Sequence, residues 1–333
     1  MSLLWLSHPR FVDHEAGTNH PERPARLGAV VAGKASVRAP DAIVERVPRP
    51  ATRADLEVVH DVALLDTIEA VAGRGGGRLD MDTVMNDASL DAALLAAGAG
   101  LEAVDGLLAG EADAAFCAVR PPGHHATGER SMGFCLFNNV AVTAAALRAR
   151  GERVAIVDFD VHHGNGTQDI FAADADVLFV SLHQRPLYPG TGAVTELGVD
   201  DGVGTTVNVP VPPGATGALY RRAFDRVIGP AVARFAPTWL LVSAGFDGHR
   251  RDPLGEVDLS AGDYAEFIRF LRELIPAGRL VVFLEGGYDL DALTWSTGAV
   301  VAELVGVSHE AEDPSVGGSD SDSVAHAVHL HEL

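Results

Sequence analysis

Cysteine is scarce in this sequence: the 333 residues contain two, Cys117 and Cys135. Two cysteines in so long a chain do not form a disulfide framework, so a secreted, disulfide-stabilised protein is not expected. The first residues also lack the basic start and the apolar stretch of a secretory signal. No apolar run approaches the about 20 residues that a membrane-spanning helix requires. These absences predict a cytoplasmic protein that does not insert into a membrane.

Basic side chains are also in the minority. Lysine and arginine total 25 against 46 aspartates and glutamates, the formal net charge is −21, and Lys34 is the only lysine. Nucleic acid and anionic membranes repel so acidic a chain, so neither is expected as a partner. The same charge would steer a cationic substrate toward the protein, although it also serves solubility alone. The sequence leaves open whether the chain forms a homo-oligomer.

Hydrophobic residues make up 47% of the chain, which is enough for a large core. Short apolar runs alternate with stretches rich in Ala and Leu, as in a parallel sheet that helices cover on both faces. We predict strands at residues 114–119, 154–159, 177–181, 238–243 and 280–284, and helices at 89–108, 139–150, 218–235, 261–274 and 292–305. The predicted fold is α/β: a single domain with three layers, α/β/α, around a mostly parallel central sheet.

The last residues differ in composition from the rest. Strand and helix patterns alternate without interruption up to about residue 307, so residues 1–309 are predicted to form one catalytic domain. Residues 310–333 begin with an acidic stretch rich in Gly and Ser that has little to bury. We therefore expect a mobile C-terminal tail.

Four of the predicted strands are followed by loops with chemically active residues. These loops lie at 120–125, 160–166, 244–249 and 285–288, and each places His, Asp or Tyr beside glycine. In an open parallel sheet, ligands bind outside the carboxyl ends of the strands. Each loop alone is a weak signal, but together they predict a functional site at one edge of the sheet.

Two of these loops contain candidate ligands for a divalent metal ion. Asp158, Asp160 and His162 are spaced two apart, so an extended backbone turns all three to the same side. Asp160 and His162 offer an oxygen and a nitrogen, and Asp247 can complete the set from another strand. Three protein ligands with an open position describe a catalytic zinc site, although ferrous iron accepts the same ligands. Two carboxylates largely cancel the charge of the ion, so such a site needs a separate general base.

The adjacent histidines His124 and His125 are the candidates for that base, because imidazole titrates near neutral pH. Asp158 and Asn165 could fix their tautomers by hydrogen bonding. Tyr288 follows two glycines, which favours a positioned functional side chain over a core aromatic. For each of these residues taken alone, the alternative to a catalytic role is a structural one, in which its polar groups are simply hydrogen-bonded within the fold.

Beyond these individual features, the chain resembles the histone deacetylases of the arginase–deacetylase fold, and their class II branch in particular. The matching segments are 20–26, 120–126, 133–135, 158–168, 181–183, 243–255 and 285–290. They occur in order over nearly the whole chain, and only the tail falls outside them. The resemblance implies that Asp160, His162 and Asp247 bind zinc, that His125 is the general base, and that His124 is its electrostatic partner.

Further roles follow from the same resemblance. Asp158 and Asn165 match the groups that hydrogen-bond the two histidines, and Asn at 165 is the class II form. Tyr288 matches the hydroxyl that polarises the substrate carbonyl and stabilises the oxyanion.

The resemblance also implies a substrate tunnel. Gly133 and Phe134 would form one wall, with the glycine carbonyl accepting the substrate amide, and Tyr188 lies near the position of the opposite wall. Arg26 resembles the arginine beside the channel through which acetate leaves. Leu254 occupies the position where polyamine-preferring relatives place an acidic residue.

Two structural potassium ions are implied as well, and both would be bound partly through backbone carbonyls. The residues of the first site would be Asp158, Asp160, His162, Ser181 and Leu182. Those of the second would be Phe171, Asp174, Val177 and Thr205.

Three functions compete at this point. The favoured one is a zinc-dependent deacetylase acting on acetyl-lysine or a related short acyl-lysine, because Leu254 offers no charge to a polyamine. An acetylpolyamine amidohydrolase is the alternative, and a non-catalytic acyl-lysine-binding module is less favoured because no site residue is missing. A manganese enzyme of the arginase type would need a second, Asp-rich metal site.

Overall fold

The computed structural model describes all residues from Met1 to Leu333 and contains an eight-stranded sheet in which every pair of neighbours is parallel. The strand order is β2-β1-β5-β10-β9-β6-β7-β8. The strands are β1 (Leu3–Leu6), β2 (Ile43–Arg46), β5 (Ala114–Cys117), β6 (Val154–Asp158), β7 (Val177–Gln184), β8 (Thr206–Val211), β9 (Trp239–Ala244) and β10 (Leu280–Leu284). The central strands β5, β6, β9 and β10 are buried along their whole length, which explains their continuous apolar sequences.

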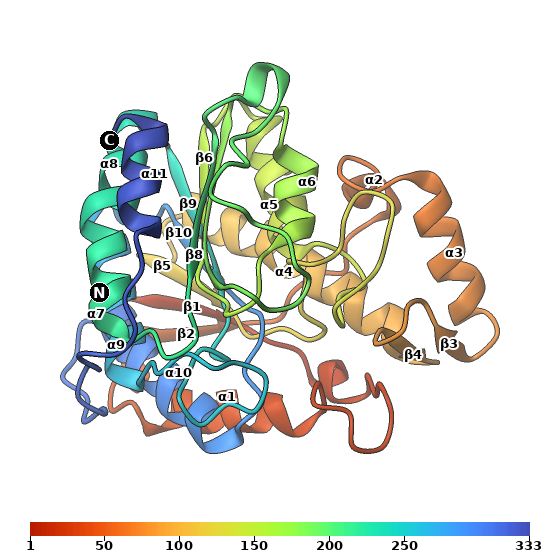
Figure 1. The fold of residues 1–333 in the computed structure, drawn as a ribbon. Helices are drawn as coiled ribbons and strands as arrows, with labels where there is room; N and C mark the ends of the chain where they lie inside the picture. The colour runs from red at the N-terminus through yellow and green to blue at the C-terminus, as the bar shows by residue number, and fades with distance from the viewer.

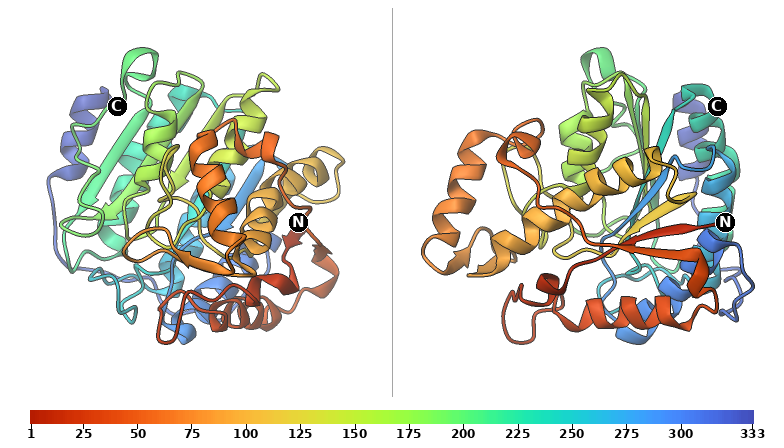
Figure 2. Two further views of the ribbon diagram at one scale, coloured as in Figure 1. Left: turned by 90° about the vertical axis from the view of Figure 1, so that its right-hand side faces the viewer. Right: turned by 180° about the vertical axis from the view of Figure 1, so that it is seen from behind.

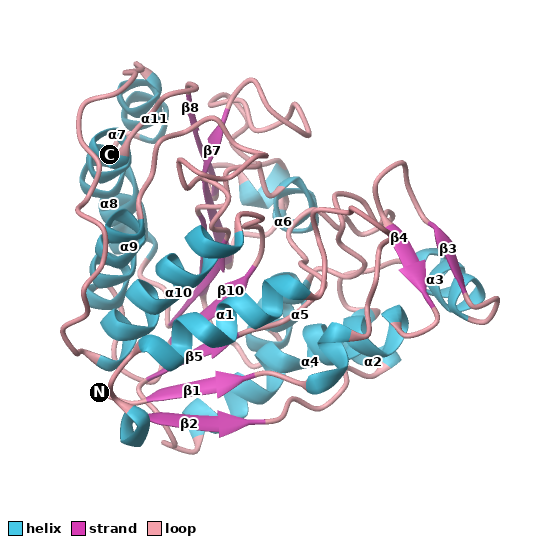
Figure 3. Ribbon diagram, turned by 90° about the horizontal axis from the view of Figure 1, so that it is seen from below, coloured by secondary structure: helices cyan, strands magenta, loops and turns pink.

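Helices cover both faces of this sheet, so that the molecule has three layers (Figure 1). On one face lie α1 (Ala25–Ser36), α7 (Gly217–Ala223), α8 (Gly229–Phe235), α9 (Ala261–Glu273) and α10 (Leu290–Val305). On the other lie α4 (Ser89–Leu108), α5 (Asn139–Arg148) and α6 (Asn165–Phe171). Helices α1 and α10 pack side by side although they come from opposite ends of the chain (Figure 3). None of the helices combines the length and the apolar character that a membrane span needs.

A smaller group of elements lies beyond α4, on the side away from the sheet (Figure 1 and Figure 2). It consists of α2 (Arg53–Leu56), α3 (Val62–Ala72) and the antiparallel hairpin of β3 (Gly76–Arg78) and β4 (Val84–Asn86). Short 3₁₀ helices occur at Pro9–Val12, Pro40–Ala42 and Asp200–Gly202.

The predicted three-layer α/β/α fold is confirmed, and each predicted strand and helix is present within a few residues of its expected bounds. One predicted helix, 218–235, is interrupted by a π-helical turn at Phe224–Ile228. Pro230 follows this turn and has no N–H with which to continue the α-helical ladder, which accounts for the widened turn. The strands β1, β2 and β8 were not predicted.

Residues 310–323 bury little, as expected, because Ser323 is the one buried residue among them. The mobility expected of the tail stays a prediction, although two of its side chains bond to the domain. Glu312 accepts a hydrogen bond from the backbone N of Ala261 at the start of α9, and Ser315 donates to Asp263 at 2.6 Å. The tail ends in helix α11 (Ser323–His331), which packs against β8 and buries Val324 and Ala327. Glu312 and Ser315 therefore bond the tail to the start of α9, whereas no residue of 310–322 is buried. The domain boundary expected after residue 309 stays a prediction.

Candidate active site

The four loops that carry the candidate catalytic and metal-binding residues follow four neighbouring strands at the centre of the sheet. Across the sheet these strands are β5, β10, β9 and β6, and since all are parallel, their carboxyl ends meet at one edge. Strands β5 and β6 are consecutive in the chain, yet β10 and β9 lie between them. Such a reversal of strand order opens a crevice in which ligands bind. The prediction that the four loops gather at one edge is confirmed.

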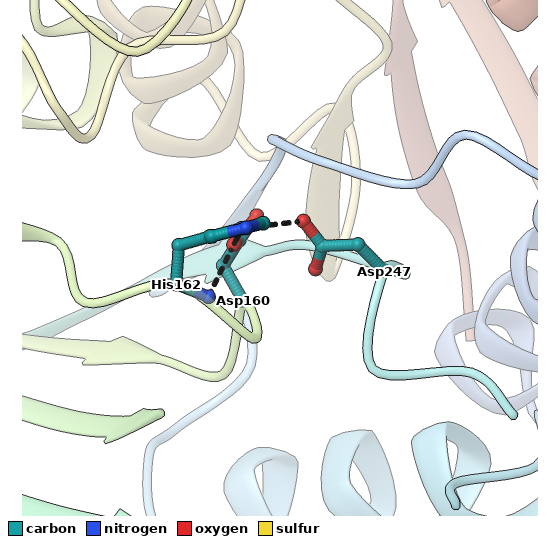
Figure 4. A group of neighbouring side chains, drawn as sticks. All are labelled: Asp160, His162 and Asp247. Atoms are coloured by element: carbon teal, nitrogen blue, oxygen red, sulfur yellow. Dashed lines mark hydrogen bonds and ion pairs between the residues drawn. The ribbon is translucent and has the colours of Figure 1, made fainter. Parts of the chain in front are cut away.

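Asp160, His162 and Asp247 come together at this edge of the sheet (Figure 4). Nδ1 of His162 lies 3.1 Å from Oδ1 of Asp160 and 3.1 Å from Oδ2 of Asp247. One ligand atom from each residue lies within 4.8 Å of the other two. The two aspartates are buried, and the histidine is partly buried.

Backbone amides fix the two carboxylates of this trio. The N–H of Gly286 donates to Oδ2 of Asp160 at 2.8 Å, and the N–H of Val161 donates to Oδ1 of Asp247 at 2.9 Å. A Cβ on Gly286 would lie 2.0 Å from Oδ2 of Asp247, so only glycine allows the backbone to approach so closely. The carboxylates are therefore set before any ligand arrives.

The electrostatics of the trio favour a bound cation. Burial raises the pKa of Asp247, and the neighbouring charge of Asp160 raises it further. Burial disfavours the charged form of His162, but hydrogen bonds to the two carboxylates outweigh it and raise the pKa of His162 to about 10. Two buried carboxylates and one imidazole thus form a donor set that fits a divalent ion such as zinc or ferrous iron.

The adjacent histidines have different partners. Nδ1 of His124 lies 2.9 Å from Oδ2 of Asp158, and Nδ1 of His125 lies 2.8 Å from Oδ1 of Asn165. Burial opposes the charged form of His124, but the carboxylates of Asp158 and Asp160 raise its pKa to about 10. Burial, with the positive charges of neighbouring histidines, holds the pKa of His125 well below its usual range. His125 is therefore the neutral member of the pair and can accept a proton.

Tyr288 lies in the loop after β10, at the same edge of the sheet. Its ring lies edge-on to Phe134, with centroids 5.9 Å apart, and the guanidinium of Arg26 lies 4.9 Å from its centroid. Tyr288 is 9% exposed, and burial raises the pKa of its hydroxyl well above the usual value. The hydroxyl therefore stays protonated and able to donate.

Two of the predicted tunnel residues, Tyr188 and Gly133, lie against His125. The ring of Tyr188 lies edge-on to His125, with centroids 5.1 Å apart. A Cβ on Gly133 would lie 2.3 Å from Cδ2 of His125, so the wall can approach the imidazole only because residue 133 is glycine. Gly133 and Phe134 both have positive φ, 56° and 68°, which is uncommon for phenylalanine. Leu254 is half-buried, in the loop that carries Asp247.

Arg26 is fully buried and binds the loop of Tyr288. Its Nε donates to the carbonyl of Gly287 at 2.6 Å and its Nη2 to the carbonyl of Glu285 at 2.5 Å. Glu22 accepts from Arg26 at 3.0 Å and also from Arg120 at 2.7 Å. The charge of Arg26 is therefore partly balanced by a buried carboxylate beside the site.

Some of the residues implied for potassium lie close to one another. Asp158 and Ser181 lie opposite each other on β6 and β7. The N–H of Asp174 donates to the carbonyl of Phe171 at 2.9 Å, and the hydroxyl of Thr205 donates to the carbonyl of Asp174 at 3.2 Å. Both potassium sites, with Leu182 and Val177 among their members, stay predictions.

Sequence reasoning assigned no role to two buried carboxylates of the site. Glu285 accepts hydrogen bonds from the backbone N–H groups of Gly123 at 2.7 Å and His124 at 3.2 Å. Asp252 accepts from the backbone N–H groups of Tyr288 at 2.5 Å and Asp289 at 3.0 Å. The signal for Glu285 was the one used for Asp158, a carboxylate at the end of an apolar strand.

Comparison with known proteins gives a consistent picture. The family profile described as the histone deacetylase domain matches residues 20–304. A probable deacetylase of Archaeoglobus fulgidus is 40% identical over 306 residues, which cover 90% of this chain and 85% of that protein. A histone deacetylase-like amidohydrolase of Pseudomonas aeruginosa is 41% identical over 271 residues, which cover 80% of this chain and 71% of that protein.

The similarity extends to three dimensions. The crystal structure of the HDA15 HD domain matches this fold with a TM-score of 0.89 and 37% sequence identity, covering 99% of this chain and 93% of that one. The profile spans every loop of the candidate site, from Arg26 to Tyr288. The chain therefore belongs to the histone deacetylase family and is a hydrolytic enzyme of that type.

Proposed function

We propose that the protein is a zinc-dependent deacetylase that hydrolyses the amide of acetyl-lysine or a related short acyl-lysine. The observation that carries the proposal is the trio Asp160, His162 and Asp247, whose ligand atoms lie within 4.8 Å of one another. His125, which is neutral, and Tyr288, whose hydroxyl stays protonated, lie in loops at the same edge of the sheet. The three features together supply what the hydrolysis of an unactivated amide requires.

Asp160, His162 and Asp247 would hold the ion. When bound, a divalent ion supplies Lewis-acid polarisation and lowers the pKa of water. The two buried carboxylates converge on the imidazole of His162, with its Nδ1 3.1 Å from an oxygen of each, which supports this assignment. Zinc is proposed over ferrous iron because three ligands with one open position are typical of catalytic zinc.

His125 would act as the general base. With its Nδ1 proton donated to Oδ1 of Asn165, its Nε2 is left to accept a proton from the attacking water. The water oxygen then bonds to the carbonyl carbon, and the C–N bond breaks as the imidazolium returns the proton to the leaving amine. The products are a free lysine side chain and acetate. His124, whose pKa is raised to about 10, would stay charged and stabilise the negative charge that develops.

Tyr288 would donate its hydroxyl hydrogen bond to the carbonyl oxygen as that oxygen becomes an oxyanion. The carbonyl of Gly133 would accept the substrate amide N–H, and Phe134 with Tyr188 would enclose the apolar lysine stem. The contact of Tyr188 with His125 and that of Phe134 with Tyr288 support these roles. Arg26 would attract the acetate product, and the two potassium ions would stabilise the loops that follow β6 and β7.

The substrate class is proposed on the character of the entrance. Leu254 is apolar and half-buried, so it offers no carboxylate to the second ammonium of a polyamine. The similarity to proteins described as deacetylases is compatible with an acyl-lysine substrate. The cytoplasmic location inferred from the cysteine content stays a prediction.

The test measures turnover of acetyl-lysine peptides, acetylputrescine and acetylspermidine by the purified chain, before and after treatment with a chelator. We expect peptide turnover that the chelator abolishes and that added Zn²⁺ restores. Asp247→Asn should lose both the metal and the turnover, whereas Asp263→Asn, at a buried carboxylate outside the site, should keep both.

A preference for the polyamines would overturn the substrate assignment and leave the mechanism intact. Turnover that survives complete removal of metal would contradict the mechanism itself. Restoration by Fe²⁺ and not by Zn²⁺ would replace zinc by iron.

A further inference from the structure

Asp252 connects the loop of Asp247 with the loop of Tyr288. Its Oδ2 accepts hydrogen bonds from the N–H groups of Tyr288 at 2.5 Å and Asp289 at 3.0 Å. Its Oδ1 accepts from the N–H of Leu254 at 3.0 Å. Asp252 is 6% exposed, so water cannot replace these bonds freely. A single carboxylate thus binds the backbone of both Tyr288 and Leu254.

The contacts of Asp252 are all to backbone N–H groups. No arginine or histidine forms an ion pair with it, unlike the buried carboxylates of Glu22 and Asp263. A buried carboxylate without a cationic partner is costly to keep, and it persists where its acceptor oxygens are needed. Here the N–H groups of two successive residues, Tyr288 and Asp289, converge on one oxygen just before α10 begins.

We infer that Asp252 is a positioning residue for Tyr288: it fixes the backbone of the tyrosine so that the hydroxyl reaches the substrate carbonyl. This inference rests on the proposed function, because Asp252 would act only through the hydroxyl of Tyr288. Arg26 holds the same loop through the carbonyls of Gly287 and Glu285. Asp252 binds N–H groups of the loop, so the carbonyl groups and the N–H groups around Tyr288 both have side-chain partners.

The geometry determines what removal of the carboxylate does. Without Oδ2, the N–H groups of Tyr288 and Asp289 lose their acceptor, and the loop between β10 and α10 can shift. A displacement of about 1 Å at a catalytic group costs on the order of 100-fold in rate, and the loss of a supporting partner typically costs about 10- to 100-fold. We therefore expect Asp252→Ala to lower kcat by about 10- to 100-fold while the metal stays bound.

A double-mutant cycle with Tyr288→Phe separates positioning from general stability. The full chain is loaded with Zn²⁺, its zinc content and Tm are measured, and kcat and KM are determined for an acetyl-lysine peptide. If Asp252 acts through the tyrosine hydroxyl, Asp252→Ala costs about 10- to 100-fold alone but less than about twofold when Tyr288→Phe is already present. Asp263→Ala, which removes a buried acceptor of the N–H groups of Ser260 and Ser315, should lower Tm and leave kcat of the folded enzyme unchanged.

Three results would overturn the inference. Equal loss from Asp252→Ala with and without Tyr288→Phe would show that Asp252 does not act through the hydroxyl. An unchanged kcat in the Asp252→Ala enzyme would show that the carboxylate is dispensable. An unchanged kcat in the Tyr288→Phe enzyme would refute the proposed role of the tyrosine, and with it this inference, whereas the first two results leave the proposed function standing. If Asp252→Ala does not fold, the same cycle is carried out with Asp252→Ser, which has one hydroxyl oxygen in place of the two carboxylate oxygens.

Discussion

The imidazole rings of His124 and His125 lie 4.0 Å apart, centroid to centroid, yet one of them contacts a carboxylate and the other an amide. The carboxylate of Asp158 raises the pKa of His124, while the amide of Asn165 offers His125 no negative charge. Burial and the neighbouring positive charges lower the pKa of His125. Two adjacent residues of the same type thus carry different charges, which gives them different roles in proton transfer.

Changing the amide to a carboxylate tests this division. Asn165→Asp places a negative charge beside His125, which stabilises the imidazolium and raises the pKa of the ring. Because the base must be neutral to accept a proton, the acidic limb of the pH profile of kcat/KM should move to higher pH. Stopped assays over a series of buffers would measure it. An acidic limb that stays in place would show that His125 is not the group that titrates.

Loss of the tyrosine hydroxyl should lower kcat nearly as much as loss of the general base. Tyr288→Phe removes one donor to the oxyanion, and such a loss typically lowers kcat by ~10²–10³. The ring contacts with Phe134 and Arg26 remain, so Tm and zinc content should not change. Metal analysis and steady-state kinetics on one preparation would test both statements. A large fall in zinc content would instead assign Tyr288 a structural role.

The glycine of the tunnel wall should tolerate no side chain. In Gly133→Ala the new Cβ would lie 2.3 Å from Cδ2 of His125, so either the wall or the imidazole must move. A shift of about 1 Å in a catalytic group can cost on the order of 100-fold in rate. Gly110→Ala is a matched control, because that glycine also has a positive φ but no atom within 4 Å of the added Cβ. Similar losses of kcat in both variants would mean that backbone strain, and not contact with His125, causes the effect.

Glu22 should make the stability of the fold sensitive to acid. Burial would raise the pKa of Glu22, but the charge of Arg120 and hydrogen bonds with His14 and Arg120 hold it well below the usual 4.5. A carboxyl group whose pKa is lowered by folding stabilises the protein fully above its unfolded pKa, and this contribution is lost as the pH falls toward the folded pKa. Removal of the charge in Glu22→Gln leaves buried arginines without their partner, which typically costs about 3–5 kcal/mol.

Urea unfolding of the wild type and of Glu22→Gln at several pH values checks this prediction. The difference in the free energy of unfolding should be largest near neutral pH and should shrink below pH 4.5, where the unfolded wild type takes up a proton. A difference that is independent of pH would mean that packing, and not charge, is what Glu22 contributes.

The central part of the fold was predictable because its sequence pattern is strong. Strands β6, β9 and β10 are buried apolar runs. The metal-ligand trio follows β6 and β9 in short glycine-containing loops, and Tyr288 follows β10 in another. The strands β1 and β2 contain only four residues each and were not predicted. Strand β5 is equally short, but its apolar run continues to Val119 and leads into the loop of His124 and His125, which made it recognisable. The hairpin of β3 and β4 consists of two three-residue strands and gave no signal either.

Other features depend on partners that are distant in sequence. Asp252 and Glu285 bind backbone N–H groups, which every residue possesses, so no pairing of residue types reveals their roles. The hydrogen bonds of the tail depend on distant partners in the same way: Ser315 and Glu312 have partners because α9 provides the carboxylate of Asp263 and the N–H of Ala261. Amino-acid composition describes the residues of a segment, whereas the conformation of the segment also depends on the hydrogen-bond partners that the rest of the chain provides.

The position of β10 has a consequence for biosynthesis. This strand, the last of the sheet in sequence, inserts between β5 and β9 in the middle of it. Until residue 284 has left the ribosome, the backbone groups along both of these strands lack their final partner, and the sheet is divided into two halves with open edges. A nascent chain halted before that point would expose the unpaired edges and apolar side chains of β5 and β9, which favour aggregation. Its need for chaperones should therefore fall once β10 has been synthesised and has inserted between them.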